Sequence, residues 1–328
     1  MTGPRTLALS VVIATRDRPE LLRRSLAALL TQDLDPTAYE VVVVDDGTDP
    51  RTRQTVEQLQ EQTHGLPALR YLAPAAHRGP AAARNRGWRA ASGDVIAFTD
   101  DDTIANPAWL AEGMRALTPD VAAVAGRIVV PLPQRPTDYE RDAAQLQHAE
   151  FATANCFVRR SDLAALEGFD ERFTSAWRED SDLHFRLLEC SLPVKRVDTA
   201  VVVHPVRPAG WGVSLRQQRK VLFDALLYRK HPELYRRRIR ARPRWGYYAV
   251  VGLLAAAAAA AVAGWSTAAA VALGAWALLT LLFFLKRLRG TSLAPLHVAD
   301  MLVTSIAIPP LAVFWRIVGW LRFRVLLL

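Results

Sequence analysis

Three consecutive aspartates, Asp100, Asp101 and Asp102, follow the apolar run 95–99. In an extended segment residues i and i+2 point to the same side, so Asp100 and Asp102 can aim at one point while Asp101 faces the other side. Two carboxylates at one point repel each other unless a divalent cation lies between them. Oxygen ligands of this kind suit Mg²⁺ or Mn²⁺, which also bind diphosphate oxygens. The spacing predicts a metal site, with an acidic turn that caps a following helix as the alternative.

The segments around these aspartates alternate between apolar strands and amphipathic helices. Strands that are apolar on both faces and alternate with helices predict an α/β fold with a mostly parallel sheet covered by helices. The expected strands are 7–15, 39–48, 69–73 and 94–102, and the expected helices between them are 18–32, 52–62 and 80–92.

Several of the expected strands end in polar residues. In parallel sheets ligands bind beyond the carboxyl ends of the strands, so these ends predict one site. The chain has neither a GxGxxG fingerprint after its first strand nor a GxxxxGK[ST] loop, which excludes the usual dinucleotide and P-loop ways of holding phosphate. The polar strand ends are Thr15-Arg16-Asp17, Asp45-Asp46 and Asp100-Asp101-Asp102.

Four stretches together resemble the family 2 glycosyltransferases, which have the GT-A fold: SVVIATRDRPELLRRSLAALLTQ, VVVVDDGT, ARNRGWRAASGDVIAFTDDD and GFDERFTSAWREDSDLHFRL. The resemblance covers about residues 8–215. It implies transfer of a sugar from a nucleotide-diphosphate donor to an acceptor, usually with inversion, and a DxD-type motif that holds the metal and the diphosphate.

The resemblance also implies roles for individual residues. Asp100 and Asp102 match the metal-binding motif, and Asp101 is expected to contact the nucleotide sugar. The residues that match nucleotide-binding positions are Thr15, Arg16, Asp17, Asp45, Asp46 and Arg84.

A second acidic group lies in WREDSDLHFRLL, residues 177–188, where the leucine spacing predicts a helix that begins near Glu179 and Asp180. An inverting transfer needs a base for the acceptor hydroxyl, and Asp180 matches the family's base. A helix N-terminus stabilises an ionised carboxylate and weakens it as a base. Trp177 and Glu179 are expected to line the sugar or acceptor pocket. The alternatives are a helix cap for the acidic residues and a core position for Trp177.

The stretch TAVVVHP, residues 199–205, predicts a further strand that ends in His204-Pro205, and a loop rich in glycine and proline follows it. Some GT-A enzymes use a histidine at this place as a further metal ligand, and an imidazole beside carboxylates favours Mn²⁺ over Mg²⁺. The alternative is a histidine that only forms hydrogen bonds at a strand end.

Charge and apolarity are concentrated in the last third of the chain. The 328 residues are 51% hydrophobic with a net charge of +9, and lysine and arginine crowd the window 216–244, where Asp224 and Glu233 are the only acidic residues. Such a basic run can bind nucleic acid or anionic lipid. Anionic membrane lipids are the expected partner rather than nucleic acid, because the run lacks the interleaved aromatic residues of a base-stacking platform and adjoins an apolar span.

Two uncharged stretches, 246–264 and 265–285, are each long enough for a helix that crosses a membrane. Basic residues flank the pair on both sides, which predicts a two-helix hairpin with both ends in the cytoplasm. The alternative is a buried helical hairpin in a soluble core. The segment 293–328 contains Pro309-Pro310 and several arginines, and it predicts a re-entrant or interfacial helix pair or a third helix.

These observations predict three regions and a cell-membrane location. The regions are a cytoplasmic GT-A domain at 1–215, basic linker helices at 216–245 and a membrane region at 246–328. No secretory signal is expected at the beginning of the chain, and two cysteines, Cys156 and Cys190, fit a reducing compartment.

The expected enzyme is a metal-dependent, membrane-anchored inverting glycosyltransferase. It would use a nucleotide-diphosphate sugar as donor and a hydroxyl of a lipid-linked or cell-surface glycan precursor as acceptor. A polyprenyl-phosphate sugar synthase of the same fold is the alternative, although its anionic acceptor needs no base.

Overall fold

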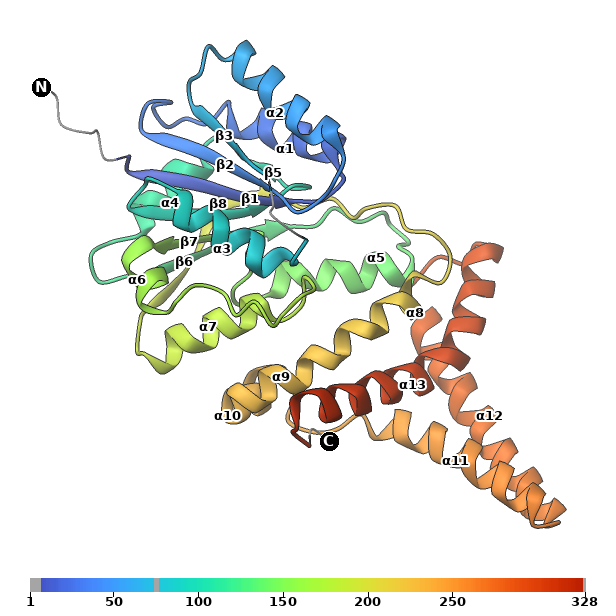
Figure 1. Cartoon of the computed structure of the whole chain (residues 1–328). Helices are drawn as coiled ribbons and strands as arrows, with labels where there is room; N and C mark the ends of the chain where they lie inside the picture. The colour runs from blue at the N-terminus through green and yellow to red at the C-terminus, as the bar shows by residue number, and fades with distance from the viewer. Residues whose placement is uncertain (1–6, 74–76, 327–328) are drawn as a thin grey trace, which may run out of the picture. The chain divides into compact units, whose positions relative to one another are not determined.

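The computed structural model describes residues 7–73 and 77–326, and the chain divides into two compact units (Figure 1). The first unit comprises the residues up to Pro131 and Gln145–Pro205, and the second comprises Leu132–Ala144 and Val206–Leu328. The segment 132–144 therefore belongs to the second unit, although strands of the first unit precede and follow it in the sequence.

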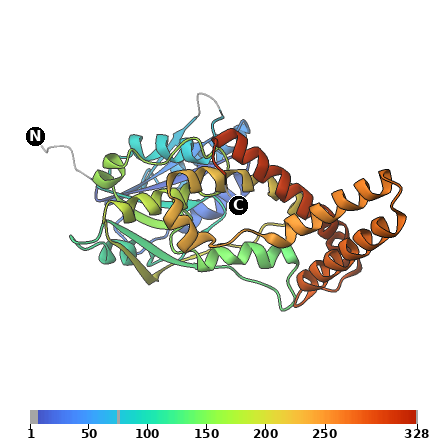
Figure 2. The ribbon, with the colours of Figure 1, turned by 90° about the horizontal axis from the view of Figure 1, so that it is seen from below.

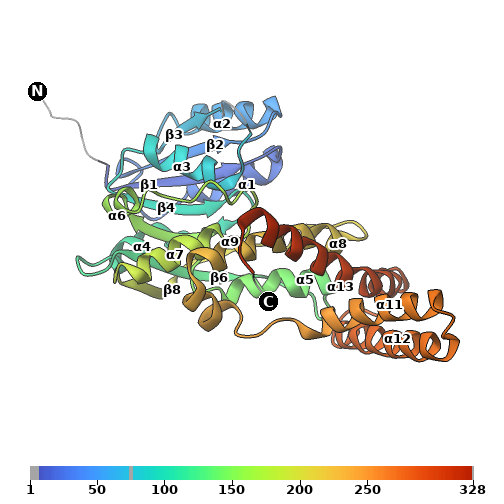
Figure 3. The same ribbon diagram turned by 60° about the horizontal axis from the view of Figure 1, so that its bottom comes forward.

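The first unit is built on one mixed β-sheet (Figure 3). Its strands are β1 (Leu9–Thr15), β2 (Tyr39–Asp45), β3 (Ala68–Leu72), β4 (Val95–Asp100), β5 (Ile104–Ala105), β6 (Ala123–Val129), β7 (Asn155–Arg159) and β8 (Val194–Val203). Among the described residues the strands lie in the order β3-β2-β1-β4-β7-β6-β8-β5. β3, β2, β1 and β4 are parallel, and β7 runs antiparallel to both of its neighbours.

The sheet differs from the expected one in its second half. The sequence patterns do not predict β5, β6 or β7. β8 begins at Val194, before the strand expected at 199–205, and ends at Val203. β6 contains Gly126 and a register shift at Arg127, and β5 has only two residues, so neither shows a sustained strand pattern.

Helices cover both faces of this sheet. Their bounds are α1 (Pro19–Leu29), α2 (Pro50–Gln62), α3 (Pro80–Ala90), α4 (Trp109–Ala116), α6 (Arg160–Ala165) and α7 (Glu179–Glu189), with a 3₁₀ turn η1 (Ala144–His148) at the unit boundary. One face of the sheet packs against Trp88 of α3, Leu163 of α6 and Leu183 of α7. The other face packs against α4, where the rings of Trp109 and Phe157 are 5.0 Å apart. Alternating strand residues thus supply both apolar layers.

Gly87 allows α3 to lie close to the sheet. A Cβ atom at this position would lie 2.4 Å from Val12 and 3.0 Å from Val44. The close approach fixes α3 directly beneath β1 and β2, and it positions Arg84, one turn earlier on the same helix.

The second unit is helical (Figures 1 and 2). It contains α5 (Asp138–Ala143), α8 (Val213–Gln217), η2 (Gln218–Val221), α9 (Leu222–Lys230), α10 (Pro232–Leu234), η3 (Tyr235–Ile239), α11 (Trp245–Val262), α12 (Ser266–Leu288) and α13 (Pro295–Phe323). Three of these, α11, α12 and α13, are long and apolar enough to cross a membrane.

α11 and α12 form the expected hairpin. Gly264, which has a φ of +77°, ends α11, and the N–H groups of Gly264 and Trp265 donate to the carbonyls of Ala261 and Ala260. This pattern satisfies the last carbonyls of α11 and requires a left-handed residue, for which glycine pays no steric penalty. The chain then reverses into α12, which lies beside α11 (Figure 2).

The last segment forms one helix instead of a helix pair. α13 runs through Pro309 and Pro310 without a break. Each proline removes one backbone donor, but packing of α13 on α9, α11 and α12 supports the helix on either side.

Candidate active site

The carboxyl ends of β1, β2 and β4 lie side by side at one edge of the sheet. Parallel pairing places Thr15 opposite Asp45 and Ala14 opposite Asp100. Because the three strands are in register, the polar residues that follow them lie next to one another. The register therefore gathers the three polar strand ends that the sequence singles out.

Asp100, Asp102 and His204 form a compact group of potential metal ligands. One donor atom from each residue can be chosen so that all lie within 4.8 Å of one another. His204 Nε2 lies 3.8 Å from Asp100 Oδ2 and 3.4 Å from Asp102 Oδ1. Two carboxylates and one imidazole at this spacing are a donor set that fits a divalent cation.

The short strand β5 explains how His204 reaches the two aspartates. β5 begins two residues after Asp102 and pairs with the end of β8, with Ile104 opposite Val203. The backbone N–H of His204 also donates to the carbonyl of Val129 at 2.8 Å. The histidine is therefore held by backbone pairing on both sides.

Asp100 is kept ionised in this group. Burial alone raises the pKa of its carboxyl, but the hydrogen bond to His204 and the charge of Arg84 outweigh burial and lower that pKa below the usual range. An ionised carboxylate is the form that a metal ion needs.

Asp101 points away from this group, as the alternation of an extended segment predicts. Its carboxylate accepts hydrogen bonds from the Thr15 hydroxyl at 2.7 Å and from Arg18 Nη1 at 3.0 Å. Burial raises the pKa of Asp101 to about 6 even though the positive charge of Arg18 opposes the shift. Asp101 thus connects the end of β4 to the loop after β1.

The two aspartates after β2 hold the loops around them. Asp45 accepts from the Tyr71 hydroxyl at 2.9 Å and from the backbone N–H of Gly47 at 2.8 Å. Asp46 accepts from the backbone N–H groups of Arg78 and Gly79, each at 3.0 Å, and also contacts the His77 ring. Both carboxylates are buried.

Asp17 joins the loop after β1 to the loop after β2. Its carboxylate accepts from the backbone N–H groups of Thr48 at 2.8 Å and Asp49 at 3.0 Å, and these bonds lower its pKa although desolvation opposes them. The residue has a φ of +51°, a left-handed conformation that aspartate tolerates better than most residues. Arg16, beside it, contacts the His77 ring at 2.8 Å.

Arg84 is buried between two carboxylates. Its Nη2 donates to Asp100 and its Nη1 donates to Glu179, each at 2.9 Å, and the residue is 4% exposed. One guanidinium therefore joins the end of β4 to the first residue of α7. In the described residues, its remaining nitrogen Nε has no hydrogen-bond partner.

Glu179 and Asp180 begin α7, as the leucine spacing predicts. Burial raises the pKa of Glu179 to about 7, against the charge of Arg84. Burial also raises the pKa of Asp180, and a hydrogen bond from the Ser181 N–H at 2.6 Å offsets only part of that shift. At Asp180 burial outweighs the weakening that a helix N-terminus causes, so this carboxyl is a stronger base than an exposed aspartate.

Trp177 lies just before α7 and is partly exposed. The Arg178 guanidinium lies over its ring, 4.6 Å from the centroid, and Arg178 itself has a φ of +77°. Trp177 is therefore a surface residue of this unit, not a core aromatic.

Sequence reasoning missed three residues that support the site: Arg18, Tyr71 and His77. Arg18 stands one position after the Thr15-Arg16-Asp17 corner, and its basic charge near an acidic strand end was the available signal. Tyr71 lies on β3 and His77 precedes α3, and only the sheet order brings them to Asp45 and Asp46.

Comparison with known proteins identifies the family. Residues 10–170 match the family model Glycosyl transferase family 2, and residues 95–286 match the model Glycosyl transferase family group 2. Together the two matches extend from β1 through α12.

Curated relatives carry glycosyltransferase names. The chain is 27% identical over 224 residues to Glycosyltransferase AglE of Haloferax volcanii, a match that covers 65% of this chain and 71% of the relative. It is 30% identical over 222 residues to Pre-mycofactocin glycosyltransferase of Mycobacterium tuberculosis, covering 63% of this chain and 44% of the relative. The chain is also 26% identical to Validoxylamine A glucosyltransferase of Streptomyces hygroscopicus and spans 57% of its length.

Solved structures show the same fold. The mannosyltransferase PcManGT from Pyrobaculum calidifontis, solved with GDP-Man and Mn²⁺, superimposes with a TM-score of 0.59 at 23% identity, covering 94% of this chain and 86% of that one. The TarS structure from S. aureus gives a TM-score of 0.52 at 18% identity over 74% of this chain and 45% of that one. The sheet order, the family matches and these neighbours together show that the chain belongs to the family 2 glycosyltransferases and has the GT-A fold.

Proposed function

We propose that the protein is a membrane-anchored, inverting glycosyltransferase that moves a sugar from a nucleotide-diphosphate donor to a hydroxyl of a lipid-linked or cell-surface glycan precursor. The observation that carries the proposal is the link from Asp100 through Arg84 to Glu179. This link joins the potential metal ligands to the helix turn that bears Asp180.

The donor would lie along the polar edge of the sheet. Thr15, Arg16, Asp17, Asp45 and Asp46 surround the place proposed for the nucleoside, where backbone loops and the His77 ring converge. Asp101 and Arg84 support this site by fixing the loop after β1 and the end of β4.

Asp100, Asp102 and His204 would hold a divalent ion. When bound, Mn²⁺ or Mg²⁺ would neutralise negative charge on the diphosphate, and the imidazole donor favours Mn²⁺. The Mn²⁺ and GDP-Man bound to PcManGT, a protein of the same fold, support this assignment.

Asp180 would act as the base. As the acceptor oxygen forms its bond to the anomeric carbon, the bond from that carbon to the diphosphate oxygen breaks, and the diphosphate leaves with the electron pair. Asp180 accepts the proton of the acceptor hydroxyl, and its raised pKa suits it to that task. Trp177 and Glu179 would border the sugar or the acceptor.

The membrane anchor would be the hairpin of α11 and α12. Few residues of either helix are buried: 11% of the α11 window and 6% of the α12 window. A helix pair this exposed fits a lipid surrounding better than a soluble core. The positive flanks on both sides support a cytoplasmic catalytic unit.

Donor binding gives the direct test. We expect nucleotide-diphosphate sugars together with Mn²⁺ to raise the thermal unfolding temperature of the full chain in detergent, since a ligand that binds the native state stabilises it. The Asp102→Asn variant should lose this shift while its unfolding without ligand changes little. The proposal would be refuted if no nucleoside-diphosphate sugar stabilised the protein with either Mn²⁺ or Mg²⁺.

A further inference from the structure

The second unit contains an open groove where the chain turns from α12 toward α13. Its volume is about 580 Å³. One wall is the segment before α5, and the other is the end of α12 with the loop that follows. The lining residues are Gln134, Arg135, Leu285, Leu288, Arg289, Gly290, Thr291 and Leu293.

The lining combines two cations with an apolar strip. Arg135 and Arg289 are both exposed, and in the part of the chain that the structure describes neither side chain has an acceptor. Leu285 and Leu293 are 49% and 59% exposed. Among the described residues that line the groove there is no carboxylate to neutralise the two guanidinium groups.

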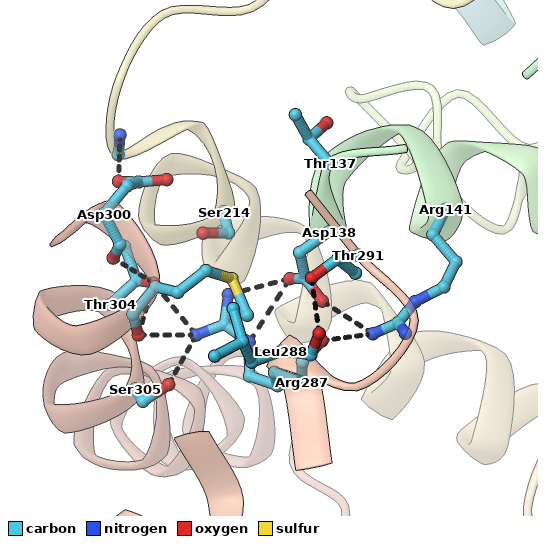
Figure 4. A network of polar contacts seen from close by, with 12 residues as sticks. Thr137, Asp138, Arg141, Ser214, Arg287, Leu288, Thr291, Asp300, Thr304 and Ser305 are labelled. Atoms are coloured by element: carbon cyan, nitrogen blue, oxygen red, sulfur yellow. Dashed lines mark hydrogen bonds and ion pairs between the residues drawn. The ribbon is translucent and has the colours of Figure 1, made fainter. Parts of the chain in front are cut away.

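A network of polar contacts fixes the two walls to each other (Figure 4). Arg141 of α5 donates to the backbone carbonyls of Arg289 at 2.6 Å and Arg287 at 2.8 Å. The Thr291 hydroxyl donates to the Leu288 carbonyl at 2.8 Å, and the Ser292 N–H donates to the Pro136 carbonyl at 2.9 Å.

Among the described arginines near the groove, some are already paired within this network and others are not. The Arg287 guanidinium donates to Asp138 at 2.8 Å and to the Thr304 and Ser305 hydroxyls at 2.9 Å each (Figure 4). Arg141 also donates to Asp138, at 3.1 Å. The nearby acid is therefore neutralised inside the network, and Arg135 and Arg289 remain for an external anion.

We propose that this groove binds one anionic phospholipid of the bilayer. The lipid phosphate would lie between the guanidinium groups of Arg135 and Arg289, which suit phosphate oxygens, and an acyl chain would lie along Leu285, Leu288 and Leu293. The inference rests on the proposed crossing of the membrane by α12.

The length of α12 supports a headgroup position for the groove. Its 23 residues extend roughly 34 Å at about 1.5 Å per residue, slightly more than a hydrocarbon core of about 30 Å. The groove lies at one end of this helix, where phosphates of the surrounding lipids would lie. A site that accepts both the phosphate and the acyl chain of a lipid must lie at the boundary between the headgroups and the hydrocarbon core.

The test compares the full chain with two double variants in detergent micelles that contain phosphatidylglycerol or phosphatidylcholine. Thermal unfolding should show a larger stabilisation by phosphatidylglycerol for the natural protein. In Arg135→Gln/Arg289→Gln the half-saturating amount of phosphatidylglycerol should rise about tenfold, because two charge-assisted hydrogen bonds are lost.

The matched control is Arg242→Gln/Lys286→Gln, which removes two exposed charges at the same flanks of the apolar hairpin and leaves the groove intact. It should respond to phosphatidylglycerol as the natural protein does. Equal losses in both double variants would mean diffuse charge attraction and would overturn the proposal. The proposal would also be overturned if inorganic phosphate alone stabilised the natural protein and the groove variant abolished that effect. The acyl chain of the lipid would then contribute nothing to binding.

The donor-induced shift with Mn²⁺, measured on the same samples, keeps the two proposals apart. It should be the same in both double variants and in the natural protein. If the donor shift persists while the lipid response is unchanged in the groove variant, the groove assignment fails and the glycosyltransferase assignment stands.

Discussion

At the scale of single residues, Arg84 is a buried cation that depends on neighbouring carboxylates. It is buried, and its charge is balanced by Asp100 on one side and Glu179 on the other. The resemblance to the family implied a nucleotide-binding position for Arg84. The observed contacts make Arg84 a residue that positions two parts of the proposed site.

Removing Arg84 should destabilise the first unit. In Arg84→Met the buried carboxylate of Glu179 and the partly buried carboxylate of Asp100 lose their shared cation, and removing one partner of a buried ion pair typically costs about 3–5 kcal/mol. Calorimetric unfolding of the full chain should show a lower transition temperature, and Arg84→Met/Glu179→Gln should recover part of the loss. A single variant as stable as the natural protein would show that the bridge is unimportant.

Asp180 is predicted to set the acid limb of activity. A base must be ionised, so kcat/KM should fall as pH falls through the pKa of Asp180, and burial places that pKa above the usual range for aspartate. In Asp180→Asn transfer should drop by about 10²–10⁴-fold, the usual contribution of a general base, with donor binding retained.

The rates and the donor affinity should be measured with the same nucleotide sugar. Near-normal transfer by Asp180→Asn would remove the base assignment. Transfer by that variant to a phosphate acceptor would favour a polyprenyl-phosphate sugar synthase, because an anionic acceptor oxygen has no proton to lose.

At the scale of elements, α13 behaves differently from the other two apolar helices. Its most apolar window is 44% buried, against 11% in α11 and 6% in α12. Arg229 of α9 donates to the Phe323 carbonyl at 2.9 Å, and a Cβ at Gly319 would lie 2.6 Å from the carbonyl oxygen of Leu222. The second half of α13 thus packs directly on the basic linker helices.

This packing predicts that α13 does not cross the membrane. The linker helices are too basic for the hydrocarbon core, so the part of α13 attached to them should stay on the cytoplasmic side with its arginines. In a Cys190→Ser background, a membrane-impermeant maleimide should label Thr267→Cys in intact cells. Arg322→Cys should react only after permeabilisation.

Cys156 is buried and should stay unlabelled throughout, which makes the background suitable. Labelling of Arg322→Cys in intact cells would show instead that α13 crosses. Labelling of neither variant in intact cells would argue against the hairpin.

At the scale of the whole molecule, the positive charge and the apolar hairpin would contribute to membrane association in different ways. The net charge of +9 attracts the protein to an anionic surface, but that attraction is screened by salt. Burial of the proposed hairpin anchor in lipid would not depend on ionic strength in this way.

Membrane fractions should therefore keep the protein at high ionic strength. At about 1 M salt the screening length is about 3 Å, which removes most surface attraction. We expect the full chain to remain in the pellet after a high-salt wash and to be released by detergent, as followed by immunoblot. Release by salt alone would show that the protein is only peripherally associated with the membrane.

The amino-acid sequence determined the parallel half of the sheet and the apolar hairpin, because each depends on short-range periodicity. The strands around Val12, Val42 and Phe98 are apolar on both faces, and the spans around residues 246–285 carry no charge. Those patterns follow from what each segment must bury, so they can be read locally.

Only the tertiary structure decided the antiparallel half of the sheet and the contacts inside the site. β7 inserts between β4 and β6, and β5 brings Asp102 to His204, although about a hundred residues separate them in the sequence. Arg84 lies between two carboxylates, and segment 132–144 belongs to the helical unit. Both features also depend on contacts between residues that are distant in the sequence. Such pairings depend on which surfaces meet after folding, and no local pattern encodes that choice.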